Sequence, residues 1–360
     1  YLDDIRLFRH GGNVFWYGLL VACLLVAPAV LREFYVGELS QVFILAIAGV
    51  GLMLLIGYTG LASLGHGAFM GIGAYVNTYL ITKGVPFVVS FPVAGLAALA
   101  AGVAVALPAN RMTGIYLAIA TLAFSQIVEQ VVVRWESVTR GFQGMPVPPP
   151  DLFGHRLASA WEFYYLCLVV LVVVVLGAIN LTRSPTGRAM VAIRDSEISA
   201  QSLGVNLVRY KTIAFAVSAF ITGLAGALFA HKLKFISPDA FNIILSIQLL
   251  LMVVVGGLGS IHGAIFGAIF VGGLRLDPFK KRDGINVEDD GELFQHIDRR
   301  GVLFPLKHAD IVAIDLGTIG KFLLRQALGV SQSTQISGDK LPQSHAERSP
   351  FPLIYCHLVN

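Results

Sequence analysis

The stretch RSPTGRAMVAIRDSEISAQSLGVNLVRYK, from Arg183 to Lys211, interrupts a chain that is otherwise strongly apolar. A Val- and Leu-rich run precedes it, and the run TIAFAVSAFITGLAGALFA follows it. Hydrophobic residues make up 56% of the 360 residues and charged residues only 13%, whereas soluble domains carry about 25% charged residues. The apolar runs therefore predict an all-α, polytopic membrane bundle in which this polar stretch connects two spans.

Several other classes of protein find no support in the sequence. The net charge is only +4, and no basic stripe with interleaved aromatic residues indicates nucleic-acid binding. The three cysteines lack the spacing of a zinc site or a disulfide framework. The chain also lacks the P-loop, HExxH, GxSxG and Cys-x-x-Cys motifs. We therefore expect no enzymatic activity, no bound metal and no cofactor in this chain.

Apolar segments along the chain define the candidate membrane spans, with boundaries good to a few residues. They cover residues 13–31, 39–57, 61–82, 87–109, 114–133, 161–181, 211–231, 243–258 and 261–275. The first is expected to be a retained span, and the last two are short enough to be half-helices or one broken element. The prediction is a bundle of about eight to nine membrane segments, some of them broken or re-entrant.

Lysine and arginine placement predicts the orientation of these spans. Arg6 and Arg9 precede the first span, which favours a cytoplasmic N-terminus. Alternation then places the stretch 183–211 in the cytoplasm and segment 134–160 outside. Charged residues inside the spans are scarce, and Glu129 is expected to lie near a membrane interface. Coupled carriers usually need an ionisable residue in the core. If the protein is a transporter, the energy for transport is therefore expected to come from elsewhere.

Two glycine-rich stretches resemble each other. GLASLGHGAFMG covers Gly60–Gly71 and GLGSIHGAIFG covers Gly257–Gly267, and one gap aligns their serine and histidine. Each stretch follows one apolar span and opens another, and repeats of this kind point to the midplane site of transporters. Chance similarity between glycine-rich helices is the alternative. The candidate residues of a translocation path are Gly60, Ser63, His66, Gly67, Ser260, His262 and Gly263.

Small residues also recur at four-residue intervals within the spans. One such face carries Ser218, Thr222, Gly226 and Ala230. Small side chains at this spacing let helix backbones approach closely in lipid. We expect the spans to form one closely packed bundle.

The stretch 183–211 itself predicts a pair of short helices. Ser184 followed by Pro185 is typical of a helix start, and Asp195 and Ser196 offer a second N-cap. Gly204 is a natural residue just beyond a helix end. A helix pair at the cytoplasmic face would be a docking element, although an ordinary solvated loop is the alternative.

The stretch closely resembles the cytoplasmic coupling loop of permease subunits of branched-chain amino-acid ABC importers, of the LivM type. GYTGLASLGHGAFMGIGAY, GIYLAIATLAFSQI and SIQLLLMVVVGGLGSIHGAIFGA extend the resemblance over roughly residues 40–275. The resemblance implies a bacterial inner-membrane protein that imports substrate by alternating access. It implies four kinds of partner interaction: a second permease subunit, two ATPase subunits that bind the ATP, a periplasmic binding protein and membrane lipid. In the family this loop fits a groove on the ATPase, and here the matching segment contains Gly187, Arg194, Asp195, Glu197, Ala200 and Gly204.

Two features depart from the family pattern. In the outer loop VTRGFQGMP, Arg140 stands where the family usually shows the first glycine of a Thr-Gly-Gly sequence. A urea or short-amide importer therefore stays open beside an amino-acid importer, and an ion-coupled carrier is a third alternative. Residues 277–360 are charged and mixed instead of forming a closing span. We predict a permease domain over residues 1–276 and an atypical tail over 277–360, which a frame disruption, a fusion or a poorly ordered extension would explain.

The basic residues after Leu276 and the alternation of the spans indicate opposite sides of the membrane for this segment. Lys280, Lys281 and Arg282 favour a cytoplasmic position, whereas simple alternation places this segment outside. The conflict disappears if residues 243–258 and 261–275 form a single broken span, or if one of them is re-entrant. That arrangement is our prediction.

Overall fold

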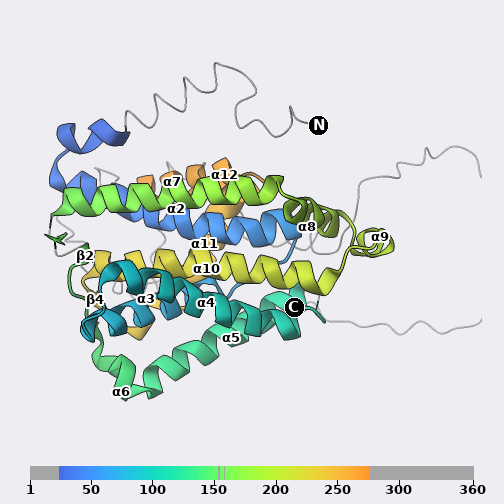
Figure 1. Ribbon diagram of the computed structural model, residues 1–360, viewed down its shortest axis with the longest axis horizontal. Helices are drawn as coiled ribbons and strands as arrows, with labels where there is room; N and C mark the ends of the chain where they lie inside the picture. The colour runs from blue at the N-terminus through green and yellow to red at the C-terminus, as the bar shows by residue number, and fades with distance from the viewer. Residues whose placement is uncertain (1–23, 113, 153–154, 158, 276–360) are drawn as a thin grey trace, which may run out of the picture. The chain divides into compact units, whose positions relative to one another are not determined.

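The computed structural model describes residues 24–275 except for residues 113, 153–154 and 158 (Figure 1). The chain divides into two units, residues 1–304 and 305–360, and all described residues belong to the first. The predicted tail 277–360, with its basic cluster, lies outside the described residues. So does most of the predicted span 13–31, of which residues 24–30 are helical.

The described chain is all-α apart from strands of two residues each. The long helices are α2 (Glu33–Thr59), α3 (His66–Thr82), α4 (Phe87–Ala109), α5 (Ile115–Arg134), α7 (Ala160–Arg183), α10 (Leu207–Leu233), α11 (Ile243–Gly256) and α12 (Ile261–Arg275). The short helices are α6 (Glu136–Thr139), α8 (Pro185–Asp195), α9 (Glu197–Ser202) and the 3-10 turns η1 (Gly141–Gln143) and η2 (Pro238–Phe241). Strands β1 (Met145–Pro146) and β4 (Phe235–Ile236) pair antiparallel, as do β2 (Asp151–Leu152) and β3 (His155–Arg156).

Six helical segments within the described residues are long and apolar enough to cross a membrane. They are residues 33–59, 87–109, 115–134, 160–183, 207–233 and 238–256. The predicted all-α, multi-pass class is thereby confirmed. The predicted total of eight to nine segments stays a prediction, because α3 and α12 are shorter and part of the chain lies outside the described residues.

Helices α2 and α10 form the centre of the bundle. Helix α10 packs on α4, α2 and α3, while α2 also packs on α7 and α12 (Figure 1). In the most apolar window of α2, 89% of the residues are buried, compared with only 22% in α5. Helix α5 therefore lies at the margin of the bundle and presents most of its surface outward.

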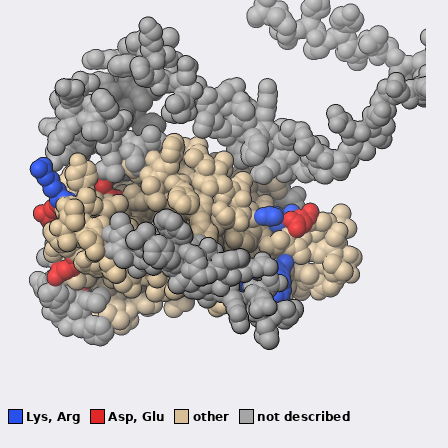
Figure 2. Space-filling model, turned by 90° about the horizontal axis from the view of Figure 1, so that it is seen from above, with Lys and Arg blue, Asp and Glu red and all other residues tan. Residues whose placement is uncertain are grey.

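The two ends of the bundle carry different loops. Helices α8 and α9 lie at one end, which we call the coupling end, on the right of Figure 1. Strands β2 and β4 lie at the opposite end, on the left. In Figure 2 the visible charged side chains gather toward the two ends, and the surface between them is mainly uncharged. This distribution is what a bilayer-spanning bundle requires, because lipid cannot solvate charges.

Helices α11 and α12 fold back on each other around the turn 257–260. A Cβ atom at Gly256 would meet the backbone of Gly263, and one at Gly267 would meet the backbone of Met252. Because such contacts require two antiparallel helices, the predicted single broken span is wrong. Farther along α12, Gly272 lies against Val42 in the first half of α2, so α12 returns toward the opposite end of the bundle. A re-entrant arrangement stays a prediction.

The departure at Arg140 has a structural counterpart. Arg140 follows α6 with a φ of 59°, and Gly141 beside it has a φ of 55°. Left-handed backbone is costly for a residue with a Cβ and free of that cost for glycine. A glycine pair is therefore the natural sequence at this turn, and Arg140 adopts the same conformation at a local energetic cost.

Candidate functional site

The stretch between α7 and α10 folds into the predicted helix pair. The Ser184 hydroxyl accepts a hydrogen bond from the Gly187 N–H at 3.3 Å, and Ser196 caps α9 by accepting from the Ser199 N–H at 3.2 Å. Gly204 follows α9 with a φ of 85°. The predicted starts at Ser184 and Ser196 and the predicted stop at Gly204 are therefore confirmed.

Arg194 attaches the end of α8 to the membrane bundle. Its Nη1 atom donates a hydrogen bond of 2.7 Å to the carbonyl oxygen of Gly57, in the last turn of α2. A Cβ atom at Gly60 would lie 3.2 Å from Arg194 Cγ, and one at Gly259 would lie 3.3 Å from Nη1. One side chain thus contacts both glycine-rich stretches, at the end of α2 and at the turn between α11 and α12.

A second contact fixes α9 to α10. Lys211 Nζ forms an ion pair of 2.8 Å with Glu197 Oε1, and the Lys211 side chain is only 3% exposed. Ala200 is buried, whereas Ile198 and Leu203 are 84% and 82% exposed. Asp195 pairs with its neighbour Arg194 at 3.4 Å on the surface. The helix pair is therefore anchored on one face and presents two large apolar side chains on the other.

The first glycine-rich stretch enters the interior of the bundle. After Gly60, with a φ of 71°, a non-helical segment leads to α3, which begins at the fully buried His66. His66 Nε2 lies 2.8 Å from Ser218 Oγ, whose hydroxyl donates to the Gly51 carbonyl at 2.7 Å. Because the serine proton is used in that bond, His66 Nε2–H is the donor and Nδ1 is the unprotonated nitrogen.

The second stretch repeats the turn but does not bury its histidine. Gly257 and Gly259 have φ values of 102° and 94°, and the Ser260 hydroxyl accepts a bond of 3.0 Å from the Gly263 N–H. His262, the counterpart of His66, is exposed. The parallel in chain path is clear, since each stretch ends one apolar helix and opens another. It stays a prediction that a translocation path is lined by residues of both stretches, namely Gly60, Ser63, His66, Gly67, Ser260, His262 and Gly263.

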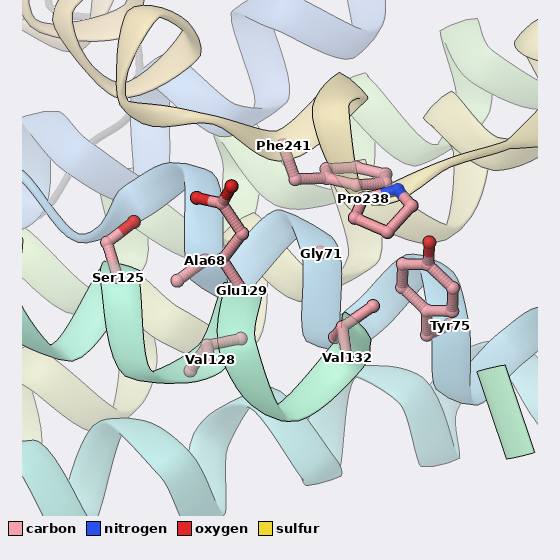
Figure 3. Close-up of a pocket in the computed structure, with 9 residues that line it drawn as sticks. All are labelled: Ala68, Gly71, Tyr75, Ser125, Val128, Glu129, Val132, Pro238 and Phe241. Atoms are coloured by element: carbon pink, nitrogen blue, oxygen red, sulfur yellow. The ribbon is translucent and has the colours of Figure 1, made fainter. Parts of the chain in front are cut away.

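A small cleft between α3, α5 and η2 was not predicted from the sequence (Figure 3). Its polar lining consists of Tyr75, Ser125 and Glu129, and its apolar lining includes Ala68 and Gly71 of the first glycine-rich stretch, Val128, Val132, Pro238 and Phe241. The cavity measures about 10 Å³, which is room for about one water molecule. The signals that pointed toward it were Glu129 and the glycines, but no sequence pattern joined them.

Nothing in the described part of the chain resembles a metal centre, because no group of three or more His, Cys, Asp or Glu residues could hold an ion there. The remaining features are a bundle of long apolar helices, two helices (α3 and α12) that begin after a non-helical glycine-rich segment, and a helix pair at one end of the bundle. These features are those of a multi-pass membrane protein.

Comparison with known proteins gives the family. The family described as "Branched-chain amino acid transport system / permease component" matches residues 34–276, and the chain belongs to it. The high-affinity branched-chain amino acid transport system permease protein LivM of Escherichia coli (strain K12) is 37% identical over 283 residues, which are 70% of this chain and 66% of that protein. LivM of Salmonella typhimurium is 36% identical with the same coverage.

More distant relatives are named for a different substrate. The autoinducer 2 import system permease protein LsrC of Enterobacter sp. (strain 638) is 28% identical over 268 residues, covering 71% of this chain and 74% of that protein. No solved structure gives a significant match. The chain spans 66% of the length of the two LivM relatives. These relatives are transport permeases and not enzymes, in agreement with the sequence-based expectation.

Proposed function

We propose that the chain is a membrane permease subunit of an ABC importer that carries branched-chain or related small amino acids into the cytoplasm. The proposal includes a bacterial inner-membrane location, a second permease subunit, two ATPase subunits and a periplasmic binding protein. Family membership and the similarity to two LivM proteins support the substrate class. ATP would be bound by the partner subunits, so this chain needs no cofactor.

The observation that carries the proposal is the mounting of the helix pair α8–α9. Arg194 and Lys211 attach it to α2 and α10, while Ile198 and Leu203 point outward without cover from the described residues. Exposed apolar side chains on a firmly held element favour a protein partner, because their burial there is stabilising. The orientation predicted from the sequence puts this surface in the cytoplasm, where an ATPase would bind.

The contacts of Arg194 suggest how such a partner would move the bundle. A displacement of α8 pulls on the Gly57 carbonyl through a charge-assisted hydrogen bond, and it also shifts the turn at Gly259. Both elements are ends of helices, where a change in backbone torsion costs less than inside a helix. The other residues of the segment would maintain the shape of the helix pair rather than transmit the motion; they are Gly187, Asp195, Glu197, Ala200 and Gly204.

Uptake measurements test the substrate class. Cells with and without the gene are assayed for labelled leucine and, separately, for labelled urea. We expect leucine uptake to depend on the gene and urea uptake not to depend on it. Gene-dependent urea uptake without leucine uptake would replace the proposal by the amide-importer alternative. Dependence of uptake on an ion gradient instead of ATP would replace it by an ion-coupled carrier.

The docking surface has its own test with a matched control. Ile198→Asp places a charge on α9, and Phe142→Asp places one at the opposite end of the bundle, where Phe142 is 72% exposed. We expect Ile198→Asp to reduce co-purification of the ATPase subunits at least about tenfold, and Phe142→Asp to leave it unchanged. Equal retention of the ATPase by both variants would contradict docking at α9.

A further inference from the structure

The cleft of Figure 3 contains two buried hydroxyl groups without partners. Tyr75 is 6% exposed and Ser125 is 2% exposed, yet neither hydroxyl forms a hydrogen bond with any described residue. Buried polar groups are nearly always paired, and an unpaired one costs about 1–3 kcal/mol. Both groups line the cleft, so a polar molecule in the cleft would remove this cost.

The third polar group of the cleft is a carboxylate. Glu129 lies one helical turn after Ser125 on α5, and no described lysine, arginine or histidine pairs with it. The carboxylate accepts a hydrogen bond of 3.4 Å from the Gln126 side-chain amide. Figure 3 shows Ser125 and Glu129 on one side of the cleft and Tyr75 on the other. A carboxylate without a cationic partner among the described residues, lying beside two hydroxyls, suits an ammonium group that carries further hydrogen-bonding atoms.

The remaining wall of the cleft is apolar. Val128 and Val132 extend from α5, and Phe241 covers the cleft from the side of η2. The Phe241 ring also packs edge-on against Tyr75, with 6.1 Å between ring centroids. An apolar wall facing a polar group set matches a molecule with a charged head and a small aliphatic side chain.

We propose that this cleft is a transport site that binds the α-amino acid, with Glu129 taking its ammonium group, Tyr75 and Ser125 its remaining polar atoms, and Phe241 and the α5 valines its side chain. This proposal rests on the proposed function. Because the cavity holds only about one water molecule, the cleft widens when substrate enters. Helix α5 is the element that moves, since it has the smallest buried share among the candidate spans.

Two variants of Glu129, one that removes its charge and one that keeps it, test the site in proteoliposomes that contain the whole complex and its binding protein. Glu129→Gln should lower ATP-driven uptake of labelled leucine at least about tenfold, and Glu129→Asp should restore part of it. Glu136→Gln, an exposed carboxylate on α6 that does not line the cleft, should leave uptake unchanged. Leucine uptake by Glu129→Gln at the rate of the unaltered complex would overturn the site.

A labelling experiment decides the matter even if Glu129→Gln fails to assemble. Ser125→Cys is made in a chain whose Cys23, Cys167 and Cys356 are replaced by alanine, and its reaction with a methanethiosulfonate reagent is timed. Leucine should slow the reaction at least about threefold, whereas the keto acid of leucine, which lacks the ammonium group, should not. Equal labelling with and without leucine in a complex that still transports it overturns the site alone. Absence of leucine transport by the unaltered complex overturns the proposed function instead.

Discussion

Because α3 and α10 are in close contact at Gly226, adding a single methyl group there should destabilise the protein. A Cβ atom at Gly226 would lie 2.6 Å from the Met70 carbonyl carbon and 2.7 Å from its Cα. Carbon atoms are normally about 3.5–4.0 Å apart, so Gly226→Ala requires the helices to separate by roughly 1 Å. The obstructing atoms belong to the backbone and cannot rotate away.

Gly177 on α7 provides the matched control. It also lies inside a helix, but no atom comes within 4 Å of the Cβ position. Alanine at either site gains about 0.8–1 kcal/mol of helix propensity. Only Gly226→Ala carries an overpacking cost, which is typically about 1–3 kcal/mol and belongs at the upper end here. The net change in unfolding free energy is then roughly −2 kcal/mol for Gly226→Ala and roughly +1 kcal/mol for Gly177→Ala.

Thermal unfolding of the detergent-solubilised complex measures the difference. For a chain of 360 residues, about 1 kcal/mol shifts the midpoint by only about 1–2 °C, because the entropy of unfolding grows with chain length. Gly226→Ala should therefore unfold about 2–4 °C lower than the unaltered protein, and Gly177→Ala about 1–2 °C higher. If Gly226→Ala is as stable as Gly177→Ala, the backbones of α3 and α10 are not in contact and the small-residue face has no packing role.

Three further outcomes are expected at the coupling end. Gly204→Val should reduce transport-linked ATP hydrolysis, because left-handed backbone costs a side-chain-bearing residue about 1–2 kcal/mol. Gly204→Asn should retain most of the hydrolysis, since asparagine adopts this conformation more readily. Normal transport by the valine variant would contradict a strained helix end. Glu197→Gln should lower the unfolding midpoint more than Lys211→Met. The first change leaves Lys211 without its partner at 3% exposure, whereas the second leaves Glu197 without its partner at 37% exposure. The reverse order would refute a buried anchor. In intact cells, Phe142→Cys should react with an impermeant thiol reagent and Ile198→Cys should not, and the opposite labelling would invert the predicted orientation.

Local signals made the helices and caps of this chain predictable. The predicted spans 87–109 and 114–133 agree closely with α4 and α5, because charged or glycine-containing segments bound uninterrupted apolar runs. Ser184, Ser196 and Gly204 act on their own neighbours, so their role can be derived from adjacent residues. Such features depend on backbone hydrogen bonds within one or two turns.

Long-range features escaped prediction for the corresponding reason. The Arg194 contact joins residues far apart in sequence, and its glycine acceptor carries no side chain that could mark it. The fold-back of α11 and α12 depends on glycines that let two backbones touch, while the same glycines are equally compatible with a broken span. The cleft combines α3, α5 and η2, so its three polar groups have no common sequence pattern.

The two glycine-rich stretches both contact Arg194 at a turn, but only the first stretch also lines the cleft. Each stretch begins beside Arg194, through Gly60 in the first copy and Gly259 in the second. Only the first continues inward, where Ala68 and Gly71 line the cleft, whereas the second continues along α11 and α2. A displacement of Arg194 thus acts on both helix junctions at once, but only one of them leads to the proposed site. The similarity of the copies then reflects their common attachment to the coupling helix, and the difference between His66 and His262 reflects their different surroundings inside the bundle.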